Sequence, residues 1–342
     1  MNKSKGLTIT IIFEGQSLNY DEGYGNLSVL KKMHRGNGKV YSYSSRQSLR
    51  YSLFVQGVKE FEWKPSDVVN SGSGDKQVVQ IISDIRDSEE SDLFGYMKTD
   101  VDVGKGKATV TRVSPVRILP AIAIEPYESD MEMLTNKYQA DKKNIQPNIA
   151  NIENQRSLFK YTVCIDLHRI GTESDEISTK IMPQKDYEKH KEDFDKYTSN
   201  LRNNDIGKKS KTKRVCQLLD VIGTLYRDIR GRREDLKPLF IVGGVYDTLN
   251  PFFENTVILD WKNDKPEINV SALVQQLSLN YEDQESHANI ADSTFIGIRD
   301  GFFANSSSDM KDSLPESMQK HVGSPEFVIS QLKNKVLQYY ES

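Results

Sequence analysis

Residues 31–56 read KKMHRGNGKVYSYSSRQSLRYSLFVQ, a basic loop with two glycines that leads into the start of a predicted helix. Six basic residues and no Asp or Glu occur between positions 31 and 50, although the whole chain has a net charge of −3. They are Lys31, Lys32, Arg35, Lys39, Arg46 and Arg50. Upstream, the apolar and β-branched run LTITIIF at residues 7–13 is typical of a buried strand. A core strand therefore leads into a basic loop that ends at a helix N-terminus.

The helix is predicted to run from about Ser44 to Gln56, because Ser44 and Ser45 are suitable N-caps and Gly57 is a suitable C-terminal stop. Its leucines and its arginines each recur at a spacing of four residues, so they occupy separate faces. Free backbone N–H groups and the positive end of the helix dipole suit a phosphate at the first turn. The alternative is an ordinary amphipathic helix with solvated arginines. The lack of nearby acidic residues favours an anionic partner.

The composition limits the protein to a few classes. The 342 residues are 37% hydrophobic and 28% charged, and no run approaches the ~18–20 apolar residues that a membrane span needs. The N-terminus lacks the apolar segment of a secretory signal. Cys164 and Cys216 lack the spacing of a zinc site, so we expect neither a disulfide framework nor a bound metal. These features predict a cytoplasmic protein with no cofactor and no membrane partner, built as one large domain with insertions or as two domains.

The distribution of charge is more informative than the net charge. Residues 208–233 contain nine basic and two acidic residues, whereas residues 282–342 contain ten acidic and five basic residues. A polyanion-binding protein that stacks head to tail would show this division. The alternative is a chance segregation of charges on solvated helices. The division alone does not decide between them.

The remaining patterns complete the order strand, helix, strand, strand, helix, strand. Strands are predicted within residues 112–125, 158–167 and 239–245, and a second long helix begins at Lys208 and continues through Ile229. This is the βαββαβ order of the RNA-recognition-motif, or ferredoxin-like, fold, which is an α+β class. The aromatic RNA-stacking signature of that fold is missing from these strands. We therefore expect phosphate contacts from loops and helix ends, not bases stacked on the sheet.

Other segments carry other patterns. Residues 78–87 predict a helix, residues 101–110 a β-hairpin, and residues 173–205 a charge-rich helix. Residues 127–157 are polar and show no sustained periodicity. The C-terminal part predicts two short strands (256–261 and 268–270), a helix (271–279), a strand (293–298), a polar loop (305–312) and a terminal helix (325–340).

Eight motifs resemble one known family in the same order along the chain. They are LTITIIFEGQSLN (7–19), NLSVLKK (26–32), GNGKVYSYSSRQSLRY (36–51), DLFGYM (92–97), TRVSPVRI (111–118), YTVCIDLHRIG (161–171), KTKRVCQLLDVIGTLYRDIRGRREDLKPLFIVGG (211–244) and NPFF (250–253). The family is the DevR-type backbone subunit of type I-B CRISPR Cascade complexes, within the RAMP superfamily. The resemblance covers about the first three quarters of the chain.

The resemblance implies a modified RNA-recognition-motif palm with insertions called fingers and thumb. The implied division is palm strand and helix (1–58), fingers (59–110), palm strands (111–126), thumb (127–157), palm strand-helix-strand with a charged insertion at 173–208 (158–250), and a C-terminal extension (251–342).

The resemblance also implies RNA-binding residues and partners. The implied grip on the guide-RNA backbone is Ser45, Arg46, Gln47 and Arg50, with weaker loop candidates at Asn19, Lys31, Lys32 and Lys39. On the thumb, an apolar wedge would be formed by Met131, Met133 and Leu134; alternatively, these residues pack locally under a loop. The implied partners are the CRISPR guide RNA, the target DNA strand through the guide, further copies of the chain in a helical filament, and other Cascade subunits.

Two other functions stay open at this point. Some RAMP relatives are metal-independent endoribonucleases that process the CRISPR precursor RNA and use histidine for acid–base chemistry. His34 and His168 are the residues to weigh, but no histidine pair has a spacing suited to general-acid or metal chemistry. We therefore expect a protein without catalytic residues. The other possibility is a structural interaction protein that binds no nucleic acid.

Overall fold

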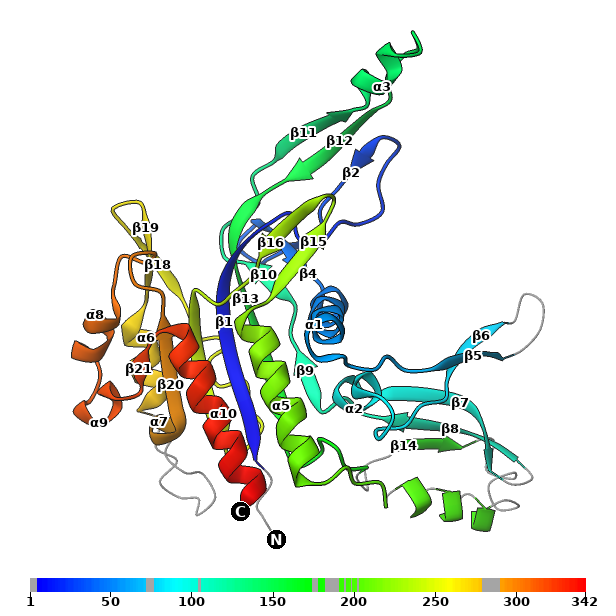
Figure 1. Cartoon of the computed structure of the whole chain (residues 1–342). Coiled ribbons are helices and arrows are strands. Elements are labelled where there is room, and N and C mark those ends of the chain that lie inside the picture. The colour runs from blue at the N-terminus through cyan, green and yellow to red at the C-terminus, as the bar shows by residue number, and fades with distance from the viewer. Residues whose placement is uncertain are drawn as a thin grey trace.

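The computed structural model (Figure 1) describes residues 5–71, 77–103, 106–173, 178–181, 191–193, 195–197, 199–201, 203–278 and 290–342. A central sheet carries helices on both faces, and two projections extend away from it. One projection contains residues 130–154 and the other residues 68–112. The protein has an α+β fold with antiparallel and mixed sheets.

Among the described residues, the largest sheet has nine strands, with the order β21-β20-β17-β1-β13-β10-β4-β3 and β9 added to β13. The strands are β1 (Gly6–Gln16), β3 (Lys32–His34), β4 (Val40–Ser44), β9 (Val116–Ile118), β10 (Ala121–Ala123), β13 (Arg156–Asp166), β17 (Phe240–Tyr246), β20 (Thr294–Ile298) and β21 (Val322–Gly323). β1 lies between β13 and β17 and is antiparallel to both. The strands predicted at 7–13, 158–167 and 239–245 are confirmed and form the centre of the sheet.

The two faces of this sheet bury two separate cores. Ile11 of β1 belongs to the core beneath α1 (Arg46–Phe61), α5 (Lys208–Gly223) and α10 (Pro325–Glu341), whereas Ile12 belongs to the core on the other face. Successive residues of a strand point to opposite faces, so an uninterrupted apolar run fits a strand covered on both sides. α5 packs between α1 and α10.

The second face is covered by the C-terminal elements. They are β18 (Leu259–Lys262), β19 (Lys265–Ile268), α6 (Val270–Leu277), α7 (Ile290–Ser293), α8 (Ser307–Asp312) and α9 (Glu316–Gln319). The first short strand, the helix and the strand at 293–298 are confirmed with shifted ends. The strand predicted at 268–270 lies instead at 265–268, because Asn263 and Asp264 adopt positive φ and place the hairpin turn there. The prediction of a polar loop at 305–312 is wrong. Ser306 and Asp309 form a capping box that starts α8.

The projection at residues 68–112 contains β5 (Val68–Ser71), β6 (Val78–Ile81), α2 (Glu89–Phe94), β7 (Tyr96–Val103) and β8 (Gly106–Arg112). The predicted hairpin at 101–110 is confirmed, and the tip between its strands lies outside the described residues. The helix predicted at 78–87 is wrong. β6 pairs antiparallel with β5, and adjacent β-branched valines favour a strand over a helix.

The second projection, which we call the arm, contains β11 (Asp130–Thr135), α3 (Lys137–Asp141) and β12 (Ile149–Asn154). β11 and β12 pair antiparallel over six residues each, and β2 (Leu27–Ser28) joins β12. The segment therefore forms a β-hairpin, although its sequence has no clear alternation. Most of its side chains are exposed, so its two faces do not need to differ in polarity.

Two predictions for the middle of the chain need correction. The helix predicted through Ile229 ends at Gly223, and β15 (Tyr226–Ile229) and β16 (Arg232–Asp235) form a hairpin. The charge-rich segment at 173–205 contains β14 (Ser178–Ile181), which pairs with β8, and short helical stretches within 191–201. The rest of that predicted helix lies outside the described residues.

A buried ion network fixes the first projection to the sheet and to α5. The Asp92 carboxylate accepts hydrogen bonds from Arg112 and Arg214, each at 2.8 Å, and from the Gly171 backbone N–H at 2.8 Å. Arg112 also contacts Glu173 at 3.1 Å. The side chains of Asp92 and Arg112 are almost completely buried. Part of the basic charge of residues 208–233 is therefore used inside the protein.

Candidate nucleic-acid interface

The first turn of α1 is built by its N-cap. Ser45 has an extended backbone, and its Oγ accepts a hydrogen bond from the Ser48 N–H at 3.3 Å. Asn19 donates from Nδ2 to the same Oγ at 3.2 Å, which joins the loop after β1 to the helix start. The backbone N–H groups of Arg46 and Gln47 donate to no acceptor among the described residues. This turn keeps donors available for a ligand.

The predicted start of the helix is confirmed, but the predicted stop is wrong. α1 continues through Gly57 to Phe61, and Glu62 ends it in the left-handed conformation at φ 59°. A Cβ on Gly57 would lie 2.1 Å from the Trp63 ring. Gly57 is therefore needed for packing in the helix interior, not as its terminator.

The first turn divides into a buried and an exposed side. Leu49 and Leu53 are buried in the core, as their spacing predicts. Arg46 and Gln47 are exposed, and neither side chain has a hydrogen bond or ion pair within the described part of the chain. No acidic residue lies in this turn. An uncompensated guanidinium at the positive end of a helix is unfavourable without an anion.

A groove of about 300 Å³ borders this turn. It is lined by Arg46, Gln47, Arg50, Phe94, Ser114, Val116, Arg117 and Ile118. No acidic residue lines it, and β9 and the end of α2 provide the side opposite α1. The groove thus combines an apolar base with basic residues from α1, which suits an anionic ligand.

Arg50 is less available than Arg46. Its Nη2 lies 3.0 Å from Glu90 Oε1, and its guanidinium lies over the Phe94 ring at 5.0 Å. Glu90 belongs to the first projection and lies far from Arg50 in sequence. The spacing of the arginines on α1 does not predict this partner, because the contact depends on the tertiary fold.

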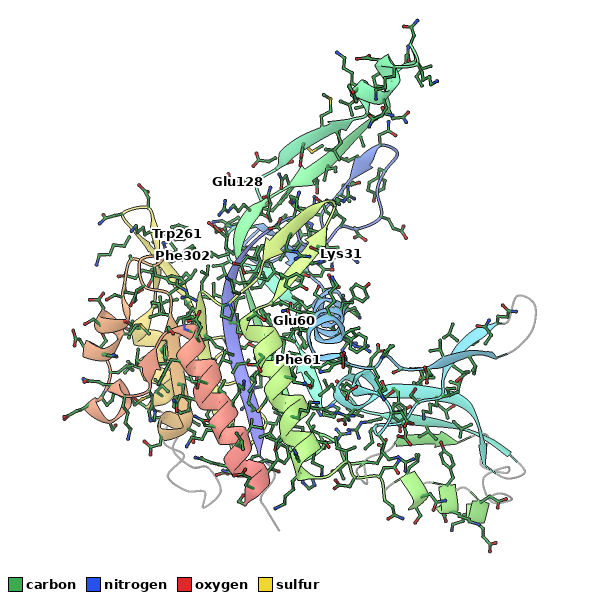
Figure 2. All side chains as sticks on the ribbon, viewed as in Figure 1. Lys31, Glu60, Phe61, Glu128, Trp261 and Phe302 are labelled. Atoms are coloured by element: carbon green, nitrogen blue, oxygen red, sulfur yellow. The ribbon has the colours of Figure 1, made fainter. Side chains whose placement is uncertain are left out.

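The predicted lysines occupy three different environments. Lys32 lies 2.7 Å from the largely buried Glu153 carboxylate and 4.5 Å from the centre of the Tyr127 ring, so it holds the base of the arm. Lys31, which is labelled in Figure 2, lies 3.7 Å from Asp21. Lys39 is exposed in the turn between β3 and β4. The three side chains therefore differ in availability, and the Lys31 backbone bonds to Asn19 and Tyr43 beside the Ser45 cap.

The arm carries the predicted wedge residues. Met131, Met133 and Leu134 are 54%, 64% and 43% exposed, so they do not pack locally under a loop. Alternation along β11 puts Met131 and Met133 on one face and Leu134 on the other. The two methionines form the exposed apolar pair.

The hairpin of β15 and β16 holds the arginines near the predicted end of the second long helix. Arg227 donates to the Leu18 carbonyl and to Ser48 Oγ, the latter at 2.7 Å. Arg232 donates to the Gln16 carbonyl at 3.3 Å, and Arg230 lies 4.0 Å from the centre of the Tyr20 ring. These arginines lie on strands and in a turn and not at the C-terminus of a helix, so they do not complement a helix dipole.

The sheet face opposite α1 is closed around β13. Lys160 Nζ donates to the Glu254 carbonyl at 2.6 Å and to the Val257 carbonyl at 3.2 Å, and the Thr162 hydroxyl donates to the Glu254 carboxylate. Burial lowers the pKa of Lys160, although Glu254 acts in the opposite direction. Bases therefore cannot stack on this part of the sheet.

The two histidines considered for ribonuclease catalysis are exposed and belong to separate elements. His34 ends β3, and His168 lies in the turn after β13. No group of His, Cys, Asp and Glu within the described residues could hold a metal ion. In the same part of the chain, no helix is long and apolar enough to cross a membrane. Cys164 and Cys216 are free thiols.

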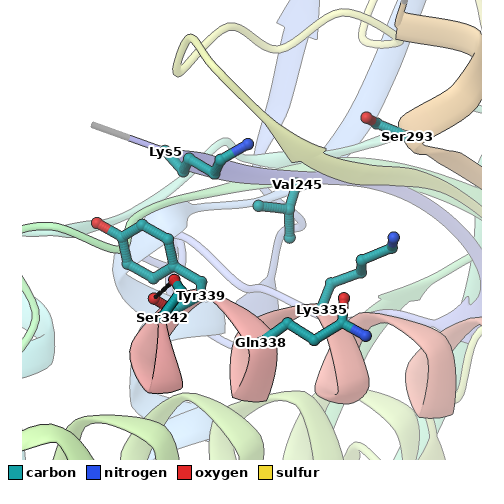
Figure 3. Close-up of a pocket in the computed structure, with 7 residues that line it drawn as sticks. All are labelled: Lys5, Val245, Ser293, Lys335, Gln338, Tyr339 and Ser342. Atoms are coloured by element: carbon teal, nitrogen blue, oxygen red, sulfur yellow. Dashed lines mark hydrogen bonds between the residues drawn. The ribbon is translucent and has the colours of Figure 1, made fainter. Parts of the chain in front are cut away.

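Another hollow, of about 270 Å³, lies beside α10 (Figure 3). Lys5, Lys335 and Tyr339 are among its lining residues, and Lys5 forms an ion pair with Asp247 at 3.0 Å. The lining of this hollow comes from Lys5, β17, α7 and α10, and none of these residues lines the α1 groove. This hollow is not part of the α1 groove.

The comparisons with known proteins agree with the motifs in the sequence. The profile of the family described as "CRISPR-associated negative auto-regulator DevR/Csa2" matches residues 7–265. The chain belongs to this family. The family expected from the sequence is thereby confirmed over most of the chain.

The fold is similar to that of a chain in a solved "CRISPR RNA-guided surveillance complex, pre-nicking", with a TM-score of 0.51 and 10% sequence identity. That alignment covers 97% of this chain and 100% of the other. A chain of another "CRISPR RNA-guided surveillance complex" aligns with a TM-score of 0.42 and 12% identity over 79% of this chain and 80% of the other. No curated protein sequence matches the chain.

Proposed function

We propose that this DevR/Csa2-family protein is a non-catalytic subunit of a CRISPR surveillance complex and binds the phosphates of the guide RNA. The observation that carries the proposal is the first turn of α1, where Arg46 and Gln47 are exposed and unpartnered in the described structure. Family membership and the fold shared with a surveillance-complex chain support the same function.

The proposed binding does not depend on the base sequence of the RNA. Backbone N–H groups and guanidiniums at a helix start bind phosphate oxygens but read no base edges. A guide RNA changes its sequence from one target to the next, so its carrier needs this property, and base pairing with the target DNA strand supplies the specificity. Ser45 shapes the turn, Arg46 and Gln47 make the contacts, and Arg50 contributes in part. Lys31 and Lys39 act from the surrounding loops, whereas Asn19 supports the Ser45 cap and Lys32 is paired with Glu153.

The strand order supports an RNA-recognition-motif palm. In the βαββαβ arrangement the fourth and third strands flank the first and the second lies outside the third, as β17, β1, β13 and β10 do here. We propose that residues 59–110 are the fingers and residues 127–157 the thumb. On the thumb, the exposed Met131 and Met133 are suited to displace a nucleotide of the guide, and Leu134 faces the other way.

Assembly follows from the same proposal. Several copies would follow one guide RNA as a helical filament in the cytoplasm, together with other Cascade subunits. The basic residues of 208–233 and the acidic residues of 282–342 give unlike charges to two parts of the chain, which favours head-to-tail contacts.

The test uses the purified full-length chain and several unrelated single-stranded RNAs. We expect similar affinities for all of them and no cleavage in EDTA. Purification free of RNA, with no binding to any strand, would overturn the proposal. Cleavage of repeat RNA that His34→Ala or His168→Ala abolishes would instead identify an endoribonuclease.

A further inference from the structure

Arginines of the β15–β16 hairpin contact every second residue from the end of β1 onward. Arg232 reaches the Gln16 carbonyl, Arg227 reaches the Leu18 carbonyl, and Arg230 stacks on Tyr20. Ser17, between the first two of these contacts, has a positive φ of 51°, so the chain bends there. Three arginines of one hairpin therefore hold the chain on both sides of this bend and next to Asn19.

Arg227 makes a second contact that closes a ring of hydrogen bonds around the first turn of α1. It donates to Ser48 Oγ at 2.7 Å, and the Ser48 N–H donates to Ser45 Oγ at 3.3 Å. Ser45 Oγ also accepts from Asn19 at 3.2 Å, and Asn19 follows Leu18, the other acceptor of Arg227. The cap, the loop and the hairpin are thus one connected unit.

Arg227 is partly buried, and both acceptors of its hydrogen bonds are neutral oxygens. It forms no ion pair with a carboxylate in the described part of the chain. Buried cations are normally matched by anions, and the start of a helix is already positive. Burial lowers the pKa of the guanidinium, but an arginine stays charged at neutral pH. The charge of Arg227 therefore adds to the positive potential of this turn.

We infer that Arg227 is a positioning residue for the phosphate site at the first turn of α1. It holds Leu18 and Ser48 so that the Ser45 cap leaves the N–H groups of Arg46 and Gln47 directed outward. The inference rests on the proposed function, since it names a residue that prepares the same site from another part of the chain.

The experiment compares two arginines of the same hairpin. Arg227→Met and Arg233→Met each remove one charge, but Arg233 pairs with Asp228 at 2.7 Å and contacts neither Leu18 nor Ser48. We expect Arg227→Met to weaken binding of a single-stranded RNA about tenfold, in line with loss of charged hydrogen bonds. Arg233→Met should stay within about twofold of the wild type.

Two further variants keep the test decisive if Arg227→Met folds poorly. Ser48→Ala deletes one acceptor without a charge change, and we expect it to weaken RNA binding in the same direction. Arg227→Lys keeps the charge, and we expect its affinity to lie between those of Arg227→Met and the wild type. Thermal unfolding of each variant separates loss of binding from loss of folding.

The outcomes separate this inference from the proposed function. If Arg46→Gln weakens RNA binding while Arg227→Met and Ser48→Ala stay within twofold of the wild type, the inference is wrong and the function stands. Equal losses in Arg227→Met and Arg233→Met would also contradict it, because charge alone would explain them. If the wild type binds no RNA, the proposed function itself fails.

Discussion

The first turn of α1 and the β15–β16 hairpin lie in contact, and both are rich in arginine, but they use it differently. Arg46 is exposed and has no partner among the described residues. In the hairpin, Arg227 and Arg232 donate to backbone carbonyls, and Arg233 pairs with Asp228. One element keeps its charge for a ligand, and the other uses its charge to hold the protein together.

The difference shows that the number of charges in a segment does not identify a binding surface. The backbone carbonyls that Arg227 and Arg232 contact lie about 200 positions away, whereas the partner of Arg233 is Asp228 of the same hairpin. A charge is free for a ligand only where the fold brings no acceptor to it. The predictions below test which charges are internal and which are free, from the largest expected effect to the smallest.

Asp92→Ala should have the largest effect on stability. It leaves the buried Arg112 and Arg214 without their shared carboxylate. Removing one partner of a buried ion pair costs about 3–5 kcal/mol of unfolding free energy. Urea unfolding measures this loss, with Arg46→Gln as a control that should stay within about 0.5 kcal/mol. An unchanged midpoint for Asp92→Ala would contradict the assignment of these arginines to the interior.

Lys32→Met should cost about 1–3 kcal/mol, because it leaves the buried Glu153 carboxylate without its cation. The same variant should change RNA affinity less than Arg46→Gln does. Urea unfolding and RNA titration of both variants check the two parts. If Lys32→Met loses more RNA affinity than Arg46→Gln and keeps its stability, Lys32 contacts the RNA.

Glu90→Gln should increase RNA affinity. Glu90 holds Arg50 at 3.0 Å, so its neutralisation releases a guanidinium beside Arg46. One more phosphate contact on a single strand would steepen the dependence of log K on log salt by about 0.7. Titration at several salt concentrations measures the slope. A weaker or unchanged affinity would show that Arg50 serves only the internal pair.

Arg233→Met should have the smallest effect. Its ion pair with Asp228 is exposed, and the Arg233 hydrogen bond keeps the pKa of Asp228 below its ordinary value. Exposed pairs contribute little to folding, so we expect no measurable shift of the urea midpoint. A clear destabilisation would mean that the hairpin depends on this pair.

Local signals predicted the elements that local chemistry decides. The apolar run at 7–13 predicted β1, the serine cap predicted the start of α1, and the leucine spacing predicted its buried face. The prediction that Gly57 ends α1 is wrong, because the role of Gly57 is set by Trp63, which packs against it from beyond the helix end. A glycine that ends a helix and a glycine that is needed for packing inside a helix both follow a helical run, so the local sequence does not distinguish them.

The candidate site was predicted only in part for the same reason. Arg46 and Gln47 could be singled out because nothing in their own segment compensates them. The pairing of Arg50 with Glu90 and of Lys32 with Glu153 depends on tertiary contacts, as does the contact of Arg227 with Ser48. The helical spacing that continued past Gly223 hid the hairpin that carries Arg227.

The most direct test of the account is a salt series of RNA binding by the wild type, Arg46→Gln/Gln47→Ala, and Lys209→Gln/Lys213→Gln. The last variant removes two exposed charges from the start of α5, in the other basic segment. We predict a steep slope for the wild type, a slope smaller by about 0.7 per lost phosphate contact for the α1 variant, and a nearly unchanged slope for the α5 variant. A wild-type slope in the α1 variant, with a reduced slope in the α5 variant, would contradict the central claim.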